Sequence, residues 1–68
     1  MNEETFNMSM RRFLKTVGVR SQPEIERAVA KAIADDKLKG NEDLPVRMQL
    51  TIDKVSLNLT LDGEIKLE

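Results

Sequence analysis

The hydrophobic residues of this chain change their spacing partway along the sequence. Up to about Leu38 they recur at intervals of three and four residues, and from Val46 to Leu67 they alternate with polar residues. The first spacing is typical of amphipathic helices, and the second is typical of strands with one apolar face. The sequence therefore predicts an α+β fold in which helices come first and strands follow.

The first segment carries signals for two helices with a turn between them. Asn2 is a suitable N-cap, and Gly18 follows the last apolar residue of the first helix, where glycine commonly ends helices. Ser21 and Glu24 have the spacing of a capping box, and Pro23 is tolerated in the first turn of a helix. We therefore expect helices over residues 3–17 and 22–38.

The second segment is predicted to form a three-stranded antiparallel meander. A two-residue turn at Asp53-Lys54 sets Ile52 opposite Val55 and keeps the apolar residues of both strands on one face. Leu61-Asp62-Gly63 is predicted to be a three-residue turn with Gly63 in the left-handed region. The strands are expected at residues 46–52, 55–60 and 64–67, with both helices packed on the apolar face. The chain, residues 1–68, is then a single ααβββ domain.

The small size of the chain points to association. A domain of 68 residues has a core near the lower limit for independent folding. The chain contains no cysteine, so neither a disulfide nor a thiolate metal site supplies further stability. We therefore expect a homodimer, or a complex with another protein, to bury additional apolar surface.

The charges are of both signs and nearly balanced, with a net charge of −1. Residues 1–40 carry eight Lys and Arg against six Asp and Glu, a balance of +2, whereas residues 41–68 carry three against six, a balance of −3. This distribution lacks the basic excess of most proteins that bind nucleic acids or anionic membranes. The acidic start of the chain and the absence of a long apolar run predict a cytoplasmic protein without a signal peptide or membrane span.

The residue types that commonly carry out catalysis are missing from the chain. It contains no His, Cys, Trp or Tyr, which removes the usual base near neutral pH, the thiolate nucleophile and the commonest zinc ligands. Three close groups of carboxylates (Asp35-Asp36, Glu42-Asp43, and Asp62 with Glu64) lack the organised spacing of a calcium loop. We therefore expect no catalytic residue, no cofactor site, no metal site and no enzymatic activity.

One side of the first predicted helix is a candidate interaction surface. Met8 is the one large apolar residue that this helix points away from its apolar stripe, and three basic residues share its side. Single exposed apolar residues are normal, so a solvated helix face is the simpler interpretation. The interaction hypothesis assigns the surface to Met8, Arg11, Arg12 and Lys15. A second route is edge-to-edge pairing of the first strand, which Pro45 and Arg47 mildly oppose.

A nucleic-acid-binding hypothesis is the alternative to a protein-interaction module. Residues 17–28 resemble the turn and recognition helix of helix-turn-helix regulators, with Gly18 in the turn and Arg20, Gln22 and Arg27 as contacts. The turn has one residue too many, and the pI is about 5.4, so nucleic acid is not the expected partner. The favoured hypothesis is a small non-enzymatic protein-interaction module that self-associates.

Both ends of the chain carry specific motifs, Met1-Asn2-Glu3-Glu4-x-Phe6-Asn7-Met8-Ser9 at the start and Asp62-Gly63-Glu64-Ile65-x-Leu67-Glu68 at the end. With these motifs the chain resembles a family of short uncharacterised bacterial proteins of about this length, and the likeness covers nearly the whole chain. The resemblance implies a bacterial, cytoplasmic, single-domain protein. It implies no activity, cofactor or site residues, because the family has none assigned.

Overall fold

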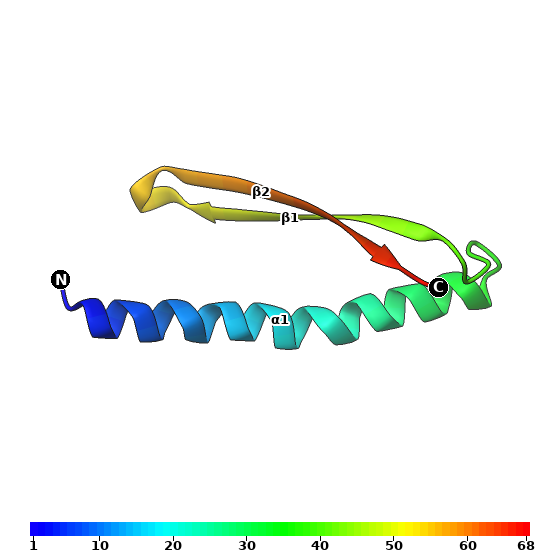
Figure 1. Cartoon of the computed structure of the whole chain (residues 1–68), viewed down its shortest axis with the longest axis horizontal. Coiled ribbons are helices and arrows are strands. Elements are labelled where there is room, and N and C mark those ends of the chain that lie inside the picture. Colours follow the sequence, from blue (N-terminus) through cyan, green and yellow to red (C-terminus); the bar gives the residue numbers. More distant parts are fainter. The chain divides into compact units, whose positions relative to one another are not determined.

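The computed structural model describes residues 1–68 and divides them into two compact units, Met1–Lys37 and Leu38–Glu68. The first unit is one helix and the second is a two-stranded antiparallel sheet with a short 3-10 turn between its strands (Figure 1). The elements are α1 (Glu3–Ala34), β1 (Asp43–Ile52), η1 (Asp53–Val55) and β2 (Leu57–Lys66). The predicted arrangement of two helices on a three-stranded meander is therefore wrong.

The helix α1 begins where the sequence predicts and continues through the expected turn. The Asn2 side chain accepts a hydrogen bond from the Thr5 amide at 3.0 Å, and Glu3 and Glu4 lie in the first turn, where acidic residues suit the positive end of the helix dipole. The predicted helices over 3–17 and 22–38 are one element, which ends before Asp35.

The predicted turn does not form, because a continuous helix gains more free energy than Gly18 and Pro23 cost it. Gly18 and Pro23 cost a helix about 1 and 3 kcal/mol respectively, while a turn gives up several backbone hydrogen bonds and the helix preference of the Glu, Arg, Lys and Ala residues around it. The capping box does not form, because the amide of Glu24 already has a carbonyl partner inside a continuous helix. The Glu24 carboxylate instead accepts from the Arg27 guanidinium at 3.0 Å.

Pro23 nevertheless changes the geometry of α1. It has no N–H to donate to the carbonyl of Val19, and its ring crowds the preceding turn. Figure 1 shows the helix bending beyond its middle, as interior prolines commonly cause. The proline therefore bends the helix and does not end it.

The turn of the hairpin is longer than the sequence predicts. Ile52 lies opposite Leu57 and not opposite Val55, so four residues, 53–56, connect the strands. Ser56 closes the turn in the left-handed region, with φ of 54°, and its amide donates to the Asp53 carbonyl at 3.1 Å. Val55, predicted in the second strand, lies in η1. The register shifts by two residues, which leaves the apolar residues of the two strands on their predicted face.

Asp62-Gly63 is not a turn, because β2 runs straight through it. Gly63 lies opposite Val46, and Asp62 lies opposite Arg47, whose Nε is 2.8 Å from the Asp62 Oδ1. The apolar alternation continues through Gly63 without a change of parity, so a continuous strand keeps the same face as the predicted turn does and retains more cross-strand pairs. The strands predicted at 55–60 and 64–67 are thus parts of one strand, and no central strand exists.

No residue of the chain is buried, in either unit. The least exposed positions are half-buried, and most of them are apolar positions of the helix and of the hairpin. They include Val17, Ile25 and Val29 in α1 and Leu44, Val46, Leu50 and Ile65 in the sheet. Each unit therefore has an apolar face but no core of its own.

Candidate interaction surface

One face of the hairpin is apolar along its whole length. Five successive cross-strand pairs on this face contain only apolar residues or glycine. The pairs are Leu44 with Ile65, Val46 with Gly63, Met48 with Leu61, Leu50 with Leu59, and Ile52 with Leu57. These side chains form the hairpin face, and several remain open to solvent, with Leu61 53% exposed. The hairpin face is therefore a contiguous apolar surface that runs from one end of the sheet to the other.

The opposite face of the hairpin is polar and internally paired. Arg47 forms an ion pair with Asp62 at 2.8 Å, and the Gln49 amide donates to the Asn58 side chain at 3.0 Å. Asp43 also lies opposite Lys66. The two faces therefore differ sharply, and the apolar residues of the sheet are confined to the hairpin face.

The helix α1 carries a second apolar surface, the helix stripe. Its residues recur at three- and four-residue intervals in the first half of α1, and most of them are exposed: Phe6, Met10, Phe13, Leu14 and Val17. In the second half the apolar positions, such as Ile25 and Val29, are turned by about a quarter of a circle around the axis at 100° per residue. The stripe therefore winds around the helix and is not one straight seam.

The residues of the predicted interaction surface all lie on α1. Met8, Arg11, Arg12 and Lys15 are exposed, and their spacing sets them on one side of the helix. None of the three basic side chains forms an ion pair. Met8 is 57% exposed and Phe13 of the helix stripe is 55% exposed, so exposure does not distinguish this side from the stripe. Sequence reasoning missed this equality because it assigned the stripe to a buried core.

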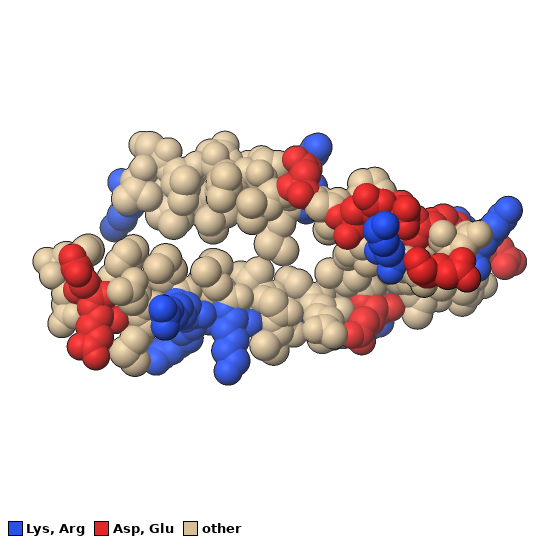
Figure 2. All heavy atoms as spheres, viewed as in Figure 1, with Lys and Arg blue, Asp and Glu red and all other residues tan.

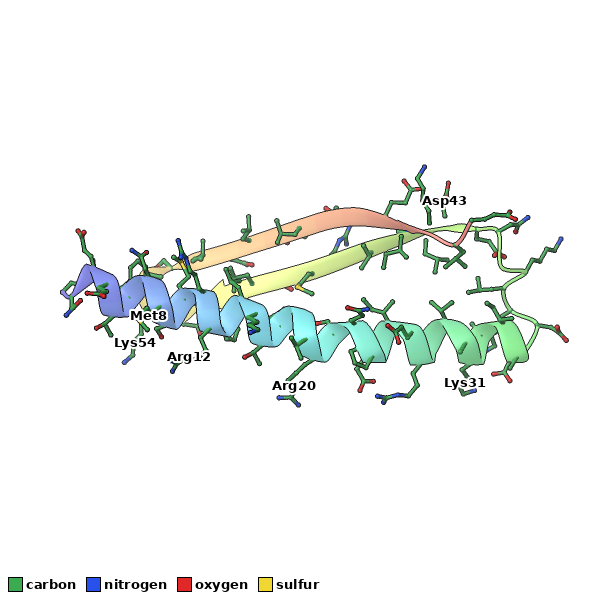
Figure 3. All side chains as sticks on the ribbon, turned by 60° about the horizontal axis from the view of Figure 1, so that its bottom comes forward. Met8, Arg12, Arg20, Lys31, Asp43 and Lys54 are labelled. Atoms are coloured by element: carbon green, nitrogen blue, oxygen red, sulfur yellow. The ribbon has the colours of Figure 1, made fainter.

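The residues of the nucleic-acid hypothesis are spread along one continuous helix. The Gln22 amide donates to Glu26 at 3.0 Å, and Arg27 pairs with Glu24 at 3.0 Å, so two of the three side chains are engaged with neighbours. Arg20 forms no ion pair and projects from the same side of α1 as Arg12 and Lys31 (Figure 3). The space-filling view in Figure 2 shows basic side chains (blue) and acidic side chains (red) on the same visible surface.

The loop before β1 holds a carboxylate in a ring of backbone donors. The amides of Lys39, Gly40 and Asn41 donate to the Glu42 carboxylate at 2.8, 2.9 and 3.1 Å. These hydrogen bonds, first that of Lys39 and then that of Gly40, hold the pKa of Glu42 below its ordinary value, against a smaller opposing effect of burial. Gly40 has φ of 104°, which L side chains rarely adopt. The loop therefore depends on both a glycine and an ionised Glu42.

The sequence predicts Glu42 only as a solvated turn residue. Its two-residue separation from Gly40 is the one signal for the loop, and this signal is too common to be specific. Nowhere do three or more side chains of metal-ligating type come together in a way that suits a metal ion. The helix also lacks an apolar stretch long enough to cross a membrane.

Comparison with known proteins identifies the family of the chain. The model of the family of unknown function DUF6494 matches residues 1–68, so the chain belongs to this family. This match confirms the resemblance to a family without an assigned activity. No curated protein matches the chain, and no solved structure matches it.

Proposed function

We propose that this chain is a small non-enzymatic protein-interaction module that self-associates through its apolar surfaces. The observation that carries the proposal is that no residue is buried, while the hairpin face and the helix stripe are both contiguous and apolar. Apolar surfaces of this extent are unfavourable in water, and their removal from solvent drives most protein association.

The hairpin face supports a second copy as the partner. Its five successive cross-strand pairs contain only apolar residues or glycine. The same face on a second copy is apolar over the same length, so it offers a partner surface of matching apolar character.

The residue content supports a role in binding and not in catalysis. The chain contains no histidine or cysteine to act as base or nucleophile near neutral pH. The proposal includes a bacterial, cytoplasmic setting, which the resemblance of the terminal motifs supports.

Sedimentation equilibrium from low to high micromolar concentration tests the proposal. We expect a dimer whose dissociation constant rises about tenfold or more for Phe13→Gln, because each chain then loses a large apolar contact. Met8→Gln is the matched control, since Met8 is equally exposed on the opposite side of α1. A wild-type chain that stays monomeric contradicts self-association. If Met8→Gln weakens the dimer and Phe13→Gln does not, the interface is the side with Arg11, Arg12 and Lys15.

A further inference from the structure

We propose that two copies of this chain join through the outer edges of their β2 strands and form one four-stranded antiparallel sheet. This inference rests on the proposed self-association and names the contact that produces it. It is carried by the free backbone groups of β2, by a proline on the other edge and by the fit of the β2 side chains across a two-fold axis.

The hydrogen bonds of the hairpin determine which backbone groups point outward. The Leu67 amide donates to the Glu42 carbonyl at 3.1 Å, and these two residues face each other one step beyond the pair of Asp43 and Lys66. Hydrogen-bonded and non-hydrogen-bonded pairs alternate along an antiparallel ladder. The backbone groups of residues 58, 60, 62, 64 and 66 therefore point away from β1, and no other backbone group of the chain pairs with them.

The outer edge of β1 is the poorer edge for pairing. By the same alternation, the backbone of Pro45 faces outward, and proline has no N–H to donate. A proline at this position is a common way to keep an edge strand from pairing with another chain. The outer edge of β2 contains no proline and offers an unbroken row of donors and acceptors. The edge pairing considered from the sequence therefore belongs to β2 and not to the first strand.

Additional strands would stabilise the two-stranded hairpin. Such hairpins are marginally stable in water, and independent stability needs three or more strands or another packed element. No residue of this hairpin is buried. Pairing two β2 strands places both of them at the centre of a four-stranded sheet and removes their free edges.

A two-fold axis at Leu61 gives the best register for this pairing. Nine of the ten residues of β2 (Leu57–Lys66) then overlap with the second copy. On the apolar side, Leu61 faces Leu61 of the second copy, and Leu59 faces its Gly63. Gly63 has no side chain, and the Cγ1 of Val46 lies 3.4 Å from the position of an added Cβ, so Leu59 of the second copy meets no side chain of Gly63 in this register.

The charges on the polar side favour the same register. With the axis at Leu61, Thr60 faces Asp62 of the second copy, and Asn58 faces its Glu64, so no like charges stand opposite each other. The other register of equal overlap has its axis at Asp62 and sets two Asp62 carboxylates face to face, which is destabilising. Both registers keep the two hairpin faces on one side of the joined sheet, because the side chains keep their parity.

A matched pair of proline substitutions tests which edge is used. Thr60 and Gln49 lie opposite each other in the hairpin, and both have outward-facing backbone groups, Thr60 on β2 and Gln49 on β1. We expect Thr60→Pro to raise the dimer dissociation constant about tenfold or more, because it removes a donor twice across the axis and leaves its acceptor unpaired. Gln49→Pro should change it by no more than about twofold, because its donor faces solvent in the proposed dimer.

Cysteine substitution tests the register through a covalent cross-link. The chain has no cysteine of its own. In the proposed dimer Leu61 and its copy form a non-hydrogen-bonded pair with Cα atoms about 4.5 Å apart, which a disulfide can bridge. Leu61→Cys should therefore form a covalent dimer on mild oxidation. Met48→Cys is the control, because Met48 faces Leu61 from β1 on the same apolar face. Asp62→Cys detects the competing register.

The combined outcomes separate this inference from the proposed function. A wild-type dimer that Thr60→Pro weakens and that Leu61→Cys cross-links supports pairing at β2. A dimer that Thr60→Pro leaves intact, or that Met48→Cys or Asp62→Cys cross-links in preference to Leu61→Cys, overturns the proposed contact and leaves self-association standing. A wild-type chain that stays monomeric overturns both.

Discussion

The contacts that stabilise the helix differ in sequence range from those that stabilise the hairpin. In α1 the side-chain interactions join residues three or four positions apart, as in the pair of Lys31 and Asp35 at 2.8 Å. In the hairpin they join residues that are distant in sequence, as in the pair of Arg47 and Asp62 at 2.8 Å. Local contacts form without other parts of the chain, whereas cross-strand contacts need a correctly paired sheet.

The two units also present their apolar residues differently. The helix stripe winds around α1, while the hairpin face lies on one side of a sheet with two free edges. A sheet with free edges and one apolar face is completed by a neighbour more readily than a helix is. We therefore expect changes in α1 outside the helix stripe to act mainly within one chain, and changes in the hairpin to act on folding and association together.

The largest expected effect is that of Pro23→Ala in the helix. Restoring the missing N–H and removing the ring clash should stabilise α1 by up to about 3 kcal/mol. Far-UV circular dichroism should show more helix and a higher melting temperature. Pro45→Ala is the control, because this proline lies on the outer edge of β1 and its replacement should change stability by no more than about 0.5 kcal/mol. No gain for Pro23→Ala would show that α1 is already broken there.

The next effect concerns the hairpin face. Leu59→Ala removes one side of the pair with Leu50 and should destabilise the chain by about 1–2 kcal/mol, because the side chain is only partly covered. Urea unfolding at low and high protein concentration measures it, and the midpoint should depend on concentration if folding is linked to association. Thr51→Ala on the polar face should stay within about 0.5 kcal/mol. Equal effects for both substitutions would contradict the importance of the hairpin face.

Substitution by alanine should change the stability in opposite directions at two glycines. Gly18→Ala should stabilise α1 by about 0.5–1 kcal/mol, because an added Cβ there meets no atom within 4 Å. Gly40→Ala should destabilise the loop before β1 by about 1 kcal/mol, because its φ of 104° strains a side chain. Thermal unfolding of the two variants gives both signs, and a gain for Gly40→Ala would rule out this loop conformation.

The smallest expected effect is the pH dependence of Glu42. Folding lowers the pKa of Glu42 below 4.5, so the folded chain favours the carboxylate form. Its contribution to stability is therefore fully present above a pH of about 4.5 and is lost as the pH falls through the lowered pKa. The free energy of unfolding, measured as a function of pH, should show a decline there that Glu42→Gln reduces. An identical pH profile for the variant would mean that the carboxylate is not held by the loop.

The alternation in the sequence predicts the hairpin face correctly, and the turns are where prediction fails. The even-numbered apolar residues of the first strand and the odd-numbered ones from Leu57 to Leu67 share one face, as their parity requires. Asp62-Gly63 has the composition of a turn, but the parity is the same with or without a turn at this point. Loop length therefore stays undetermined by the pattern, and the three-stranded meander follows from that ambiguity.

The spacing of apolar residues does not predict how exposed the candidate site is, for a different reason. The spacing of Phe6, Met10 and Phe13 shows that these residues share a side of a helix, but it does not show what covers that side. Apolar periodicity is the same for a stripe in a core and for a stripe in an interface. The Glu42 loop was missed because its hydrogen bonds depend on the conformation at Gly40, which no periodic pattern encodes.

Amide hydrogen exchange at the two outer edges of the sheet tests the central claim most directly. At a concentration above the dimer dissociation constant, the outward amides of Thr60, Asp62 and Glu64 on β2 should exchange as slowly as the inward amides of the ladder. The outward amides of Gln49 and Thr51 on β1 should exchange fast, because they face solvent. Fast exchange at both edges, or protection on β1 in place of β2, would contradict the joining of two copies through β2.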